Sequence, residues 1–152
     1  MVVLDNKEQT KYKKTSITDD NFIIKISEKE LPNLLTDSLL IDFSKKTKLV
    51  KNEFGNYFDT IFTYTKKQNT IKIYKAKEKK FVINMEINSS EFSINDNLIK
   101  IGLTKDYFIK NFNIKSCEDS LEICNMEGLI CIDFLFYQDK LKSISYNCKY
   151  ID

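Results

Sequence analysis

Hydrophobic and polar residues alternate with period two through much of the chain, a pattern typical of β-strands with one buried face. The clearest case runs over residues 81–88, where Phe81, Ile83, Met85 and Ile87 are predicted to face a core. Aromatic and β-branched residues predict further strands over residues 57–65 and 70–76, each followed by a lysine-rich turn. The middle of the chain is therefore predicted to be consecutive strands joined by short turns.

The pattern near the C-terminus predicts a hairpin whose register can be assigned. Strands over residues 129–137 and 141–150 flank a three-residue turn. Bringing the two apolar faces together pairs Phe134 with Ile144 and Ile132 with Tyr146. The same register places Cys131 and Cys148 on opposite faces of the sheet.

One longer helix is predicted after Thr104, which is suited to an N-cap position. Asp106 lies in the positively polarised first turn, and Phe108 and Phe112 share one face at a spacing of four residues. Leu103 and Phe108 are placed for a hydrophobic staple.

Nearer the N-terminus, residues 21–27 read as a first short strand. Ser27 and Glu30 form a capping-box pattern, and Pro32 limits the helix that follows to about one turn. An apolar run over residues 38–43 precedes a lysine-rich segment, residues 45–48, that is expected to be a solvated connection.

These elements predict an α+β fold, a largely antiparallel sheet of about six to eight strands with one main helix packed on one face. The length of 152 residues suits one core-bearing domain. We expect residues 1–20 to form a flexible polar lead and residues 21–152 the domain. Such a lead suits a lipoprotein whose anchor was removed, and it equally suits a frayed terminus.

Composition excludes several kinds of chemistry. The chain has no His, no Trp and no Arg, so all 24 basic residues are Lys. Without His it cannot use Ser/His or Cys/His nucleophiles or a His-ligated metal. Without Arg it has no bidentate phosphate clamp, and a net charge of +2 does not favour nucleic-acid binding. We therefore expect no cofactor, no metal and no nucleic-acid partner, although an enzyme that uses only carboxylates stays open.

The four cysteines all lie in the last quarter of the chain, at Cys117, Cys124, Cys131 and Cys148. Their spacing does not match the close pairs of a structural zinc site. Two interpretations remain, buried free thiols and disulfides formed in an oxidising compartment. For a disulfide, Cys117 with Cys124 is the least strained pairing.

Charge is concentrated in two blocks. Seven Lys and one acid occupy residues 66–80, which indicates either a solvated hairpin or attraction to acidic lipids or an acidic protein. Residues 116–139 carry acids and no Lys, which indicates either a solvated surface or a patch that steers a basic partner. The candidate partner-binding residues are Glu118, Asp119, Glu122, Glu127 and Asp133. The candidates for exposed aromatic residues that anchor an interface are Tyr57, Tyr64, Tyr74 and Tyr137.

Residues 98–112 (LIKIGLTKDYFIKNF) and 132–146 (IDFLFYQDKLKSISY) combine a strand ending in Ile-Gly, a capped helix and a hairpin. This pattern resembles the small envelope lipoproteins of the SmpA/OmlA type and the related β-lactamase-inhibitor-protein-like modules. The resemblance implies a helical segment packed on a small antiparallel sheet, and a function in binding proteins rather than catalysis. It covers about a third of the chain and assigns no binding residues.

Together these observations predict a non-catalytic protein-binding module of the bacterial envelope, an inhibitor or immunity-type protein that blocks a basic toxin or enzyme. The alternative is a structural or assembly lipoprotein of the outer membrane. The expected location is the periplasm or the outer membrane, through an N-terminal lipid anchor, with the cytoplasm as the alternative.

Overall fold

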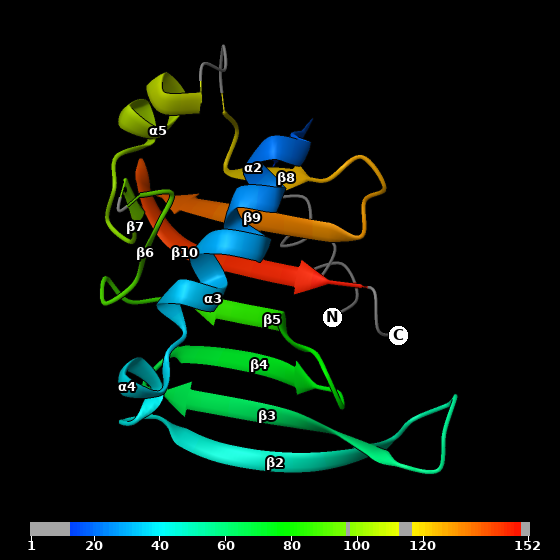
Figure 1. Ribbon diagram of the computed structural model, residues 1–152. Helices are drawn as coiled ribbons and strands as arrows, with labels where there is room; N and C mark the ends of the chain where they lie inside the picture. Colours follow the sequence, from blue (N-terminus) through cyan, green and yellow to red (C-terminus); the bar gives the residue numbers. More distant parts are fainter. Residues whose placement is uncertain (1–12, 97, 113–116, 150–152) are drawn as a thin grey trace, which may run out of the picture.

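The computed structural model describes residues 13–96, 98–112 and 117–149. Its centre is an eight-stranded sheet in the order β1-β8-β9-β10-β5-β4-β3-β2, in which only the β1–β8 pair is parallel (Figure 1). The strands are β1 (Lys14–Thr18), β2 (Ser44–Lys51), β3 (Phe58–Lys66), β4 (Asn69–Lys75), β5 (Lys80–Ile87), β8 (Ser120–Cys124), β9 (Ile130–Tyr137) and β10 (Lys140–Cys148).

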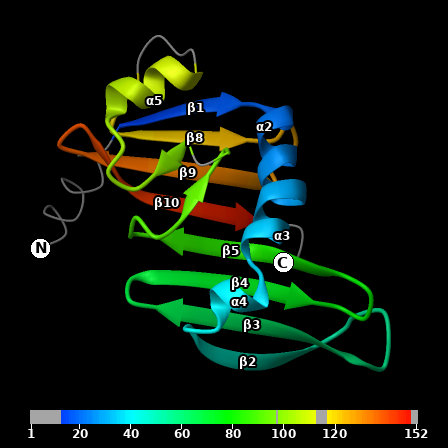
Figure 2. The same ribbon diagram turned by 60° about the vertical axis from the view of Figure 1, so that its left-hand side comes forward.

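The described helices all pack on the same face of this sheet (Figures 1 and 2). They are α2 (Asp20–Ile24), the π-helical segment η1 (Lys25–Glu30), α3 (Leu31–Leu34), α4 (Asp37–Leu40) and α5 (Lys105–Phe112). A two-stranded pair, β6 (Ser93–Ile94) and β7 (Ile99–Lys100), contributes to the same core. The predicted α+β class is therefore confirmed. Among the described residues, no helix is long and apolar enough to cross a membrane.

The prediction of a strand over residues 21–27 is wrong. This segment belongs to the continuous helical stretch α2–η1–α3, which lies across the sheet (Figure 2). Asp19 caps it by accepting a hydrogen bond from the backbone N–H of Phe22 at 3.0 Å, and Phe22, Ile23 and Ile26 are buried on its inner side. The β-branched residues favoured a strand locally, but burial of this face against the sheet favours the helix. Ser27 and Glu30 accordingly lie inside the helical stretch and form no capping box.

Two segments that were expected to be irregular are strands. Lys14–Thr18 forms β1 and pairs in parallel with β8, so the domain includes residues that we had assigned to the polar lead. Residues 1–12 lie outside the described part of the chain. The solvated connection over residues 45–48 is part of the edge strand β2, whose lysines are exposed. Lysine on an edge strand discourages pairing with another sheet.

The alternation predicted over residues 81–88 changes face within β5. Met85 and Ile87 are buried as expected, but Val82 packs on the core where Ile83 was predicted to do so. The reason is an irregularity in the β4–β5 ladder, where Lys72 pairs with Asn84 and the next pair is Ile73 with Val82. Because β5 has one extra residue at this point, the side chains on the two sides of the irregularity do not follow one continuous alternation between the faces of the sheet.

The strand pairings predicted for the C-terminal hairpin and the start of α5 are confirmed, but the predicted three-residue turn is wrong. Lys140 pairs with Tyr137, which leaves a two-residue turn, and an irregularity between Leu141 and Ser143 restores the predicted register. Phe134 pairs with Ile144 and Ile132 with Tyr146. Thr104 accepts a hydrogen bond from the backbone N–H of Tyr107 at 3.4 Å. Phe108 is fully buried, and its ring centroid lies 4.7 Å from that of Phe134.

Candidate protein-binding face

The sheet face opposite the helices carries a continuous row of polar side chains. The row follows directly from the register, in which each member pairs with the next across neighbouring strands. Its members in order are Ser16, Glu122, Asp133, Ser145, Glu86 and Thr70. We call its three acids, Glu86, Glu122 and Asp133, the carboxylate row. Because side chains alternate between faces, the neighbours of these acids along each strand point into the core.

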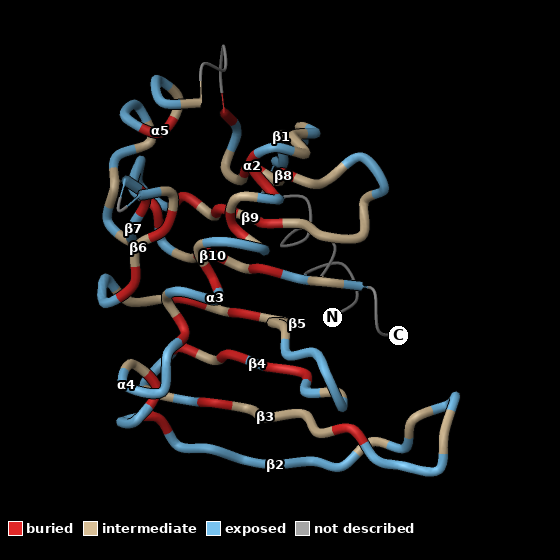
Figure 3. Tube along the Cα trace, in the orientation of Figure 1, coloured by how far each residue is buried: buried red, intermediate tan, exposed pale blue. Residues whose placement is uncertain are grey.

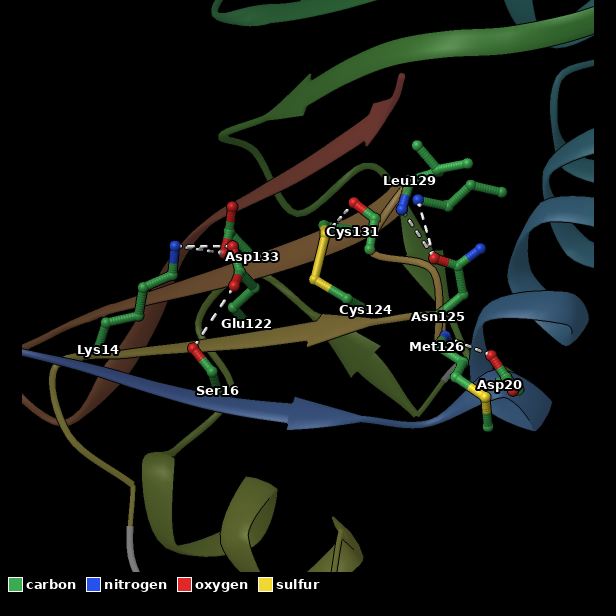
Figure 4. The surroundings of a disulfide bond; sticks show 12 residues. Lys14, Ser16, Asp20, Glu122, Cys124, Asn125, Met126, Leu129, Cys131 and Asp133 are labelled. Atoms are coloured by element: carbon green, nitrogen blue, oxygen red, sulfur yellow. Dashed lines mark hydrogen bonds and ion pairs between the residues drawn. A yellow bond between two sulfur atoms is a disulfide. The ribbon is translucent and has the colours of Figure 1, made fainter. Parts of the chain in front are cut away.

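Lys14 is the basic residue that contacts the carboxylate row (Figure 4). Its Nζ lies 2.7 Å from Glu122 Oε2 and 3.8 Å from Asp133 Oδ1. The hydrogen bond to Glu122 raises the pKa of Lys14 above its ordinary value. Ser16 Oγ lies 3.5 Å from the other Glu122 oxygen, at the outer limit of a hydrogen bond.

Asp133 is the least satisfied member of the row. Its Oδ1 is buried and accepts no hydrogen bond from the described residues. Burial raises the pKa of Asp133, Lys14 opposes that shift, and the neighbouring Glu122 and Glu86 add to it. Glu86, in contrast, accepts a hydrogen bond of 2.7 Å from Ser145 Oγ. The row therefore holds three acids against one ammonium group, and it can accept further hydrogen bonds from a basic group.

The structure brings together only part of the predicted acidic block. Glu122 and Asp133 are cross-strand neighbours. Glu118 is exposed just before β8, and Asp119 beside it accepts a hydrogen bond from the backbone N–H of Lys13 at 3.1 Å. Glu127 is exposed in the β8–β9 turn, at the other end of the same strand. Glu86 is not among the residues predicted from the sequence, because its place in the row depends on the pairing of β5 with β10.

A disulfide joins Cys124 to Cys131 beside the carboxylate row (Figure 4). The predicted pairing of Cys117 with Cys124 is therefore wrong. Cys124 and Cys131 pair directly across β8 and β9, with a Cα–Cα distance of 4.1 Å. The six residues between them contain the turn of a hairpin, and this symmetry was the signal in the sequence that could have identified the pair.

The other two cysteines are free, and Cys117 is buried. Burial raises the pKa of its thiol. Cys131 and Cys148 lie on different faces and are not bonded to each other, as the register predicted.

One group of possible metal ligands is found among the described residues. It consists of Glu122, Cys124 and Cys131, with ligand atoms within 4.8 Å of one another. Because the two sulfurs are bonded to each other, they offer no thiolate to a metal.

The lysine block of residues 66–80 is divided between two ends of the sheet. Lys66 and Lys67, at the β3–β4 turn, form ion pairs with Glu91 at 3.6 and 3.2 Å. Four exposed lysines of the block lie around the β4–β5 turn. They are Lys75, Lys77, Lys79 and Lys80. Of the four tyrosines considered as anchors, Tyr64 and Tyr74 are buried and Tyr57 and Tyr137 are exposed.

Two grooves flank the long helical stretch on the other face of the sheet. One, of about 360 Å³, separates it from β4 and β5 and is lined by residues that include Leu31, Phe81 and Val82. The second, of about 490 Å³, separates it from the β8–β9 turn. Neither groove reaches the carboxylate row.

Comparisons of the chain with models of protein families, with curated proteins and with solved structures find no match.

Proposed function

We propose that this chain is a non-catalytic protein-binding module of the bacterial envelope, which blocks a basic toxin or enzyme as an inhibitor or immunity protein does. The observation that carries the proposal is the carboxylate row on the uncovered face of the sheet. A broad polar face with fixed charges suits a protein surface, whereas a small substrate is usually held in a concave pocket.

The chemistry of the row favours a basic partner. Ser145 donates a hydrogen bond to Glu86, and Lys14 pairs with Glu122. Asp133 Oδ1 lies 3.8 Å from Lys14 Nζ and accepts no hydrogen bond from any residue that the structure describes. A lysine or arginine of the partner that displaces Lys14 would donate to both Asp133 and Glu122. Because these acids lie on paired strands, their spacing is fixed before binding, which reduces the entropy lost on association.

The test begins with capture of partners by tagged protein from envelope and secreted fractions, with stoichiometry measured for each partner. The decisive comparison uses two double variants that remove the same charge. Glu122→Gln with Asp133→Asn changes the carboxylate row, and Glu28→Gln with Asp42→Asn removes two exposed acids, one within and one just after the helical segments, outside the predicted binding residues.

The proposal expects the row variant to slow association of the captured partner about tenfold at low salt and less at high salt, since such steering is screened. The control variant should stay within about twofold of the parent. Equal effects of the two variants would contradict a role for the row. Retention of partner activity in a stoichiometric complex would contradict the inhibitor function.

The alternative function, a structural or assembly lipoprotein of the outer membrane, is favoured by a different feature. Exposed apolar side chains gather on the β2–β3 hairpin, away from the carboxylate row. Fractionation of cells that express the native protein distinguishes the two. Constitutive association with outer-membrane assembly proteins supports the alternative, while recovery without those proteins, whether from the soluble or the membrane fraction, supports the inhibitor.

A further inference from the structure

The hairpin between β2 and β3 extends beyond the neighbouring strands (Figure 1), and most of its residues are exposed (Figure 3). Large apolar residues are among them. We call residues 49–58 the arm. The exposed fraction is 94% for Phe54, 64% for Leu49, 62% for Phe58 and 42% for Tyr57. Four such side chains on one projecting hairpin are more than the scattered single exposures that are normal on a protein surface.

Hydrogen bonds hold the arm in its exposed conformation. The side-chain oxygen of Asn52 accepts from the backbone N–H of Phe54 at 2.8 Å, and its amide group donates to Asp59 Oδ2 at 2.8 Å. Asp59 is itself buried and also receives the hydroxyl hydrogen bond of Tyr74. The exposed position of Phe54 is therefore fixed by hydrogen bonds that run from the buried Asp59 carboxylate through Asn52 to the backbone of Phe54. The loop is constrained at this point.

A second contact shapes the same turn. The backbone N–H of Asn52 donates to the carbonyl oxygen of Tyr57 at 3.1 Å and closes the base of the loop. The Tyr57 ring lies over Gly55, where a Cβ would come within 2.2 Å of the ring. Only glycine leaves room for the ring at this point.

Lysines surround the exposed apolar residues. Lys51 belongs to the arm, and Lys75, Lys77, Lys79 and Lys80 lie at the adjacent end of β4 and β5. Tyr57, Phe58, Lys75 and Lys77 line one shallow depression. None of these five lysines forms an ion pair within the described part of the chain. Against these five lysines the region holds three acids, the exposed Glu53 and Glu78 and the buried Asp59, so its net charge is positive.

We propose that the arm docks on the surface of an anionic phospholipid bilayer, with Phe54 and its apolar neighbours inserted between headgroups and the lysines against lipid phosphates. Aromatic side chains with nearby lysines are the chemistry of membrane interfaces, since the apolar part enters the acyl boundary while ammonium groups stay at headgroup level. Charge complementarity selects anionic lipids, because each lysine near such a surface adds attraction.

The shape of the arm favours a bilayer over an acidic protein. Phe54 is almost fully exposed at a projecting tip, so a protein partner would need a matching pocket, whereas a bilayer accepts an inserted side chain anywhere on its surface. The arm and the carboxylate row belong to different parts of the sheet. Membrane docking therefore does not depend on the proposed inhibitor function, and either can fail alone.

The absence of Trp from the chain allows a direct test. A Phe54→Trp variant carries one indole at the tip of the arm, and a Tyr137→Trp variant carries one at an exposed position near the β9–β10 turn. Each is mixed with vesicles of phosphatidylcholine alone or of phosphatidylcholine with phosphatidylglycerol, with and without brominated lipid. The proposal expects a blue shift and bromine quenching for Phe54→Trp with the anionic vesicles, and neither change for Tyr137→Trp.

Charge is tested by matched lysine variants in vesicle sedimentation. Lys75→Gln with Lys77→Gln should weaken binding to anionic vesicles about tenfold or more. Lys100→Gln with Lys110→Gln removes the same charge from β7 and α5 and should change binding less than about twofold. Circular dichroism of all variants confirms that the fold is retained.

Three results would overturn the proposal. The first is an unchanged Phe54→Trp spectrum with anionic vesicles. The second is equal binding to vesicles with and without phosphatidylglycerol. The third is a spectral shift with poly-L-glutamate but none with vesicles, which would identify the arm as a site for acidic proteins instead.

Discussion

The hydroxyl of Tyr74 on β4 donates a hydrogen bond to the buried carboxylate of Asp59 on β3, on the face of the sheet that the helices leave open. Asn52 donates to the same Asp59 oxygen, while Asp59 Oδ1 accepts no hydrogen bond from the described residues. A buried acid with so few partners depends strongly on each of them.

Replacing Tyr74 by Phe removes one donor and leaves the ring in place. The expected loss is about 1–3 kcal/mol in the free energy of unfolding, because part of the desolvation penalty of Asp59 is no longer offset. Urea denaturation measures it. Tyr137→Phe, at an exposed position, is the control and should change stability by less than about 0.5 kcal/mol.

The same contact predicts a dependence on alkaline pH. The hydrogen bond to Asp59 raises the pKa of Tyr74 from 10.0 to about 12, so the neutral phenol is favoured in the folded state. Its contribution is fully present below pH 10 and is lost as pH rises through the folded value. Unfolding curves between pH 9 and about 12 should fall more steeply for the parent than for Tyr74→Phe. Parallel curves would contradict the assignment.

Lys14→Gln tests the electrostatics of the carboxylate row. Without the ammonium, Glu122 and Asp133 remain as like charges on paired strands, and the pKa of Asp133, already raised by burial, should rise further. Carboxyl carbon chemical shifts in an NMR titration follow it directly. A pKa of Asp133 that falls or stays unchanged would show that Lys14 does not act on it.

The loss in the free energy of unfolding caused by Lys14→Gln should depend on pH. At neutral pH the variant should lose about 1 kcal/mol, because the ion pair is partly exposed and screened. Because Glu122 raises the pKa of Lys14 above its ordinary value of 10.5, the contribution of the ion pair is fully present below pH 10.5 and is lost as pH rises further, so the difference between parent and variant should shrink at alkaline pH. Lys72→Gln, at an exposed position of β4, is the matched control.

The disulfide predicts a labelling pattern. Alkylation of denatured, unreduced protein should modify Cys117 and Cys148 only, and reduction should make all four cysteines reactive. Peptide mapping identifies the labelled residues, and label on Cys124 or Cys131 before reduction would contradict the bond. Cys124→Ala with Cys131→Ala should lower the unfolding free energy by about 2 kcal/mol, since the bond closes a short loop.

Phe108 anchors α5 to the sheet through ring contacts with Phe134 and Phe136 on β9. Phe108→Ala should destabilise the protein by about 3–5 kcal/mol, because the buried ring leaves a cavity. Its exposed neighbour supplies the control, and Tyr107→Ala should cost less than about 0.5 kcal/mol in the same denaturation experiment.

Elements whose information lies within one short segment could be predicted from the sequence. The pairing of Phe134 with Ile144 follows from matching the two alternating apolar faces, although the turn is one residue shorter than predicted. The start of α5 needs only Thr104 followed by spaced aromatics. The candidate site was predictable in part for the same reason, because Glu122 and Asp133 lie on strands of one hairpin. Glu86 and Lys14 were not, because they reach the row through pairings between distant segments.

Local propensity failed where tertiary burial competes with it. Residues 21–27 are rich in Ile and read as a strand, yet in the helical stretch Ile23 and Ile26 cover the sheet and become almost fully buried. Residues 14–18 look polar and unstructured because only one position in two is shielded, and β1 exists because β8 offers it hydrogen bonds. Neither the helix nor the strand can be predicted from the residues of its own segment alone.

Residue types and their alternation were enough to predict the α+β class, the lack of His and Arg chemistry, and the side of the sheet on which most strand residues lie, because these are local properties. Only the folded structure shows which acids meet in the carboxylate row, that Cys124 bonds to Cys131, and that the exposed Phe54 is linked through Asn52 to the buried Asp59. These depend on strand order and on burial of groups distant in the chain, which only the folded sheet brings into contact.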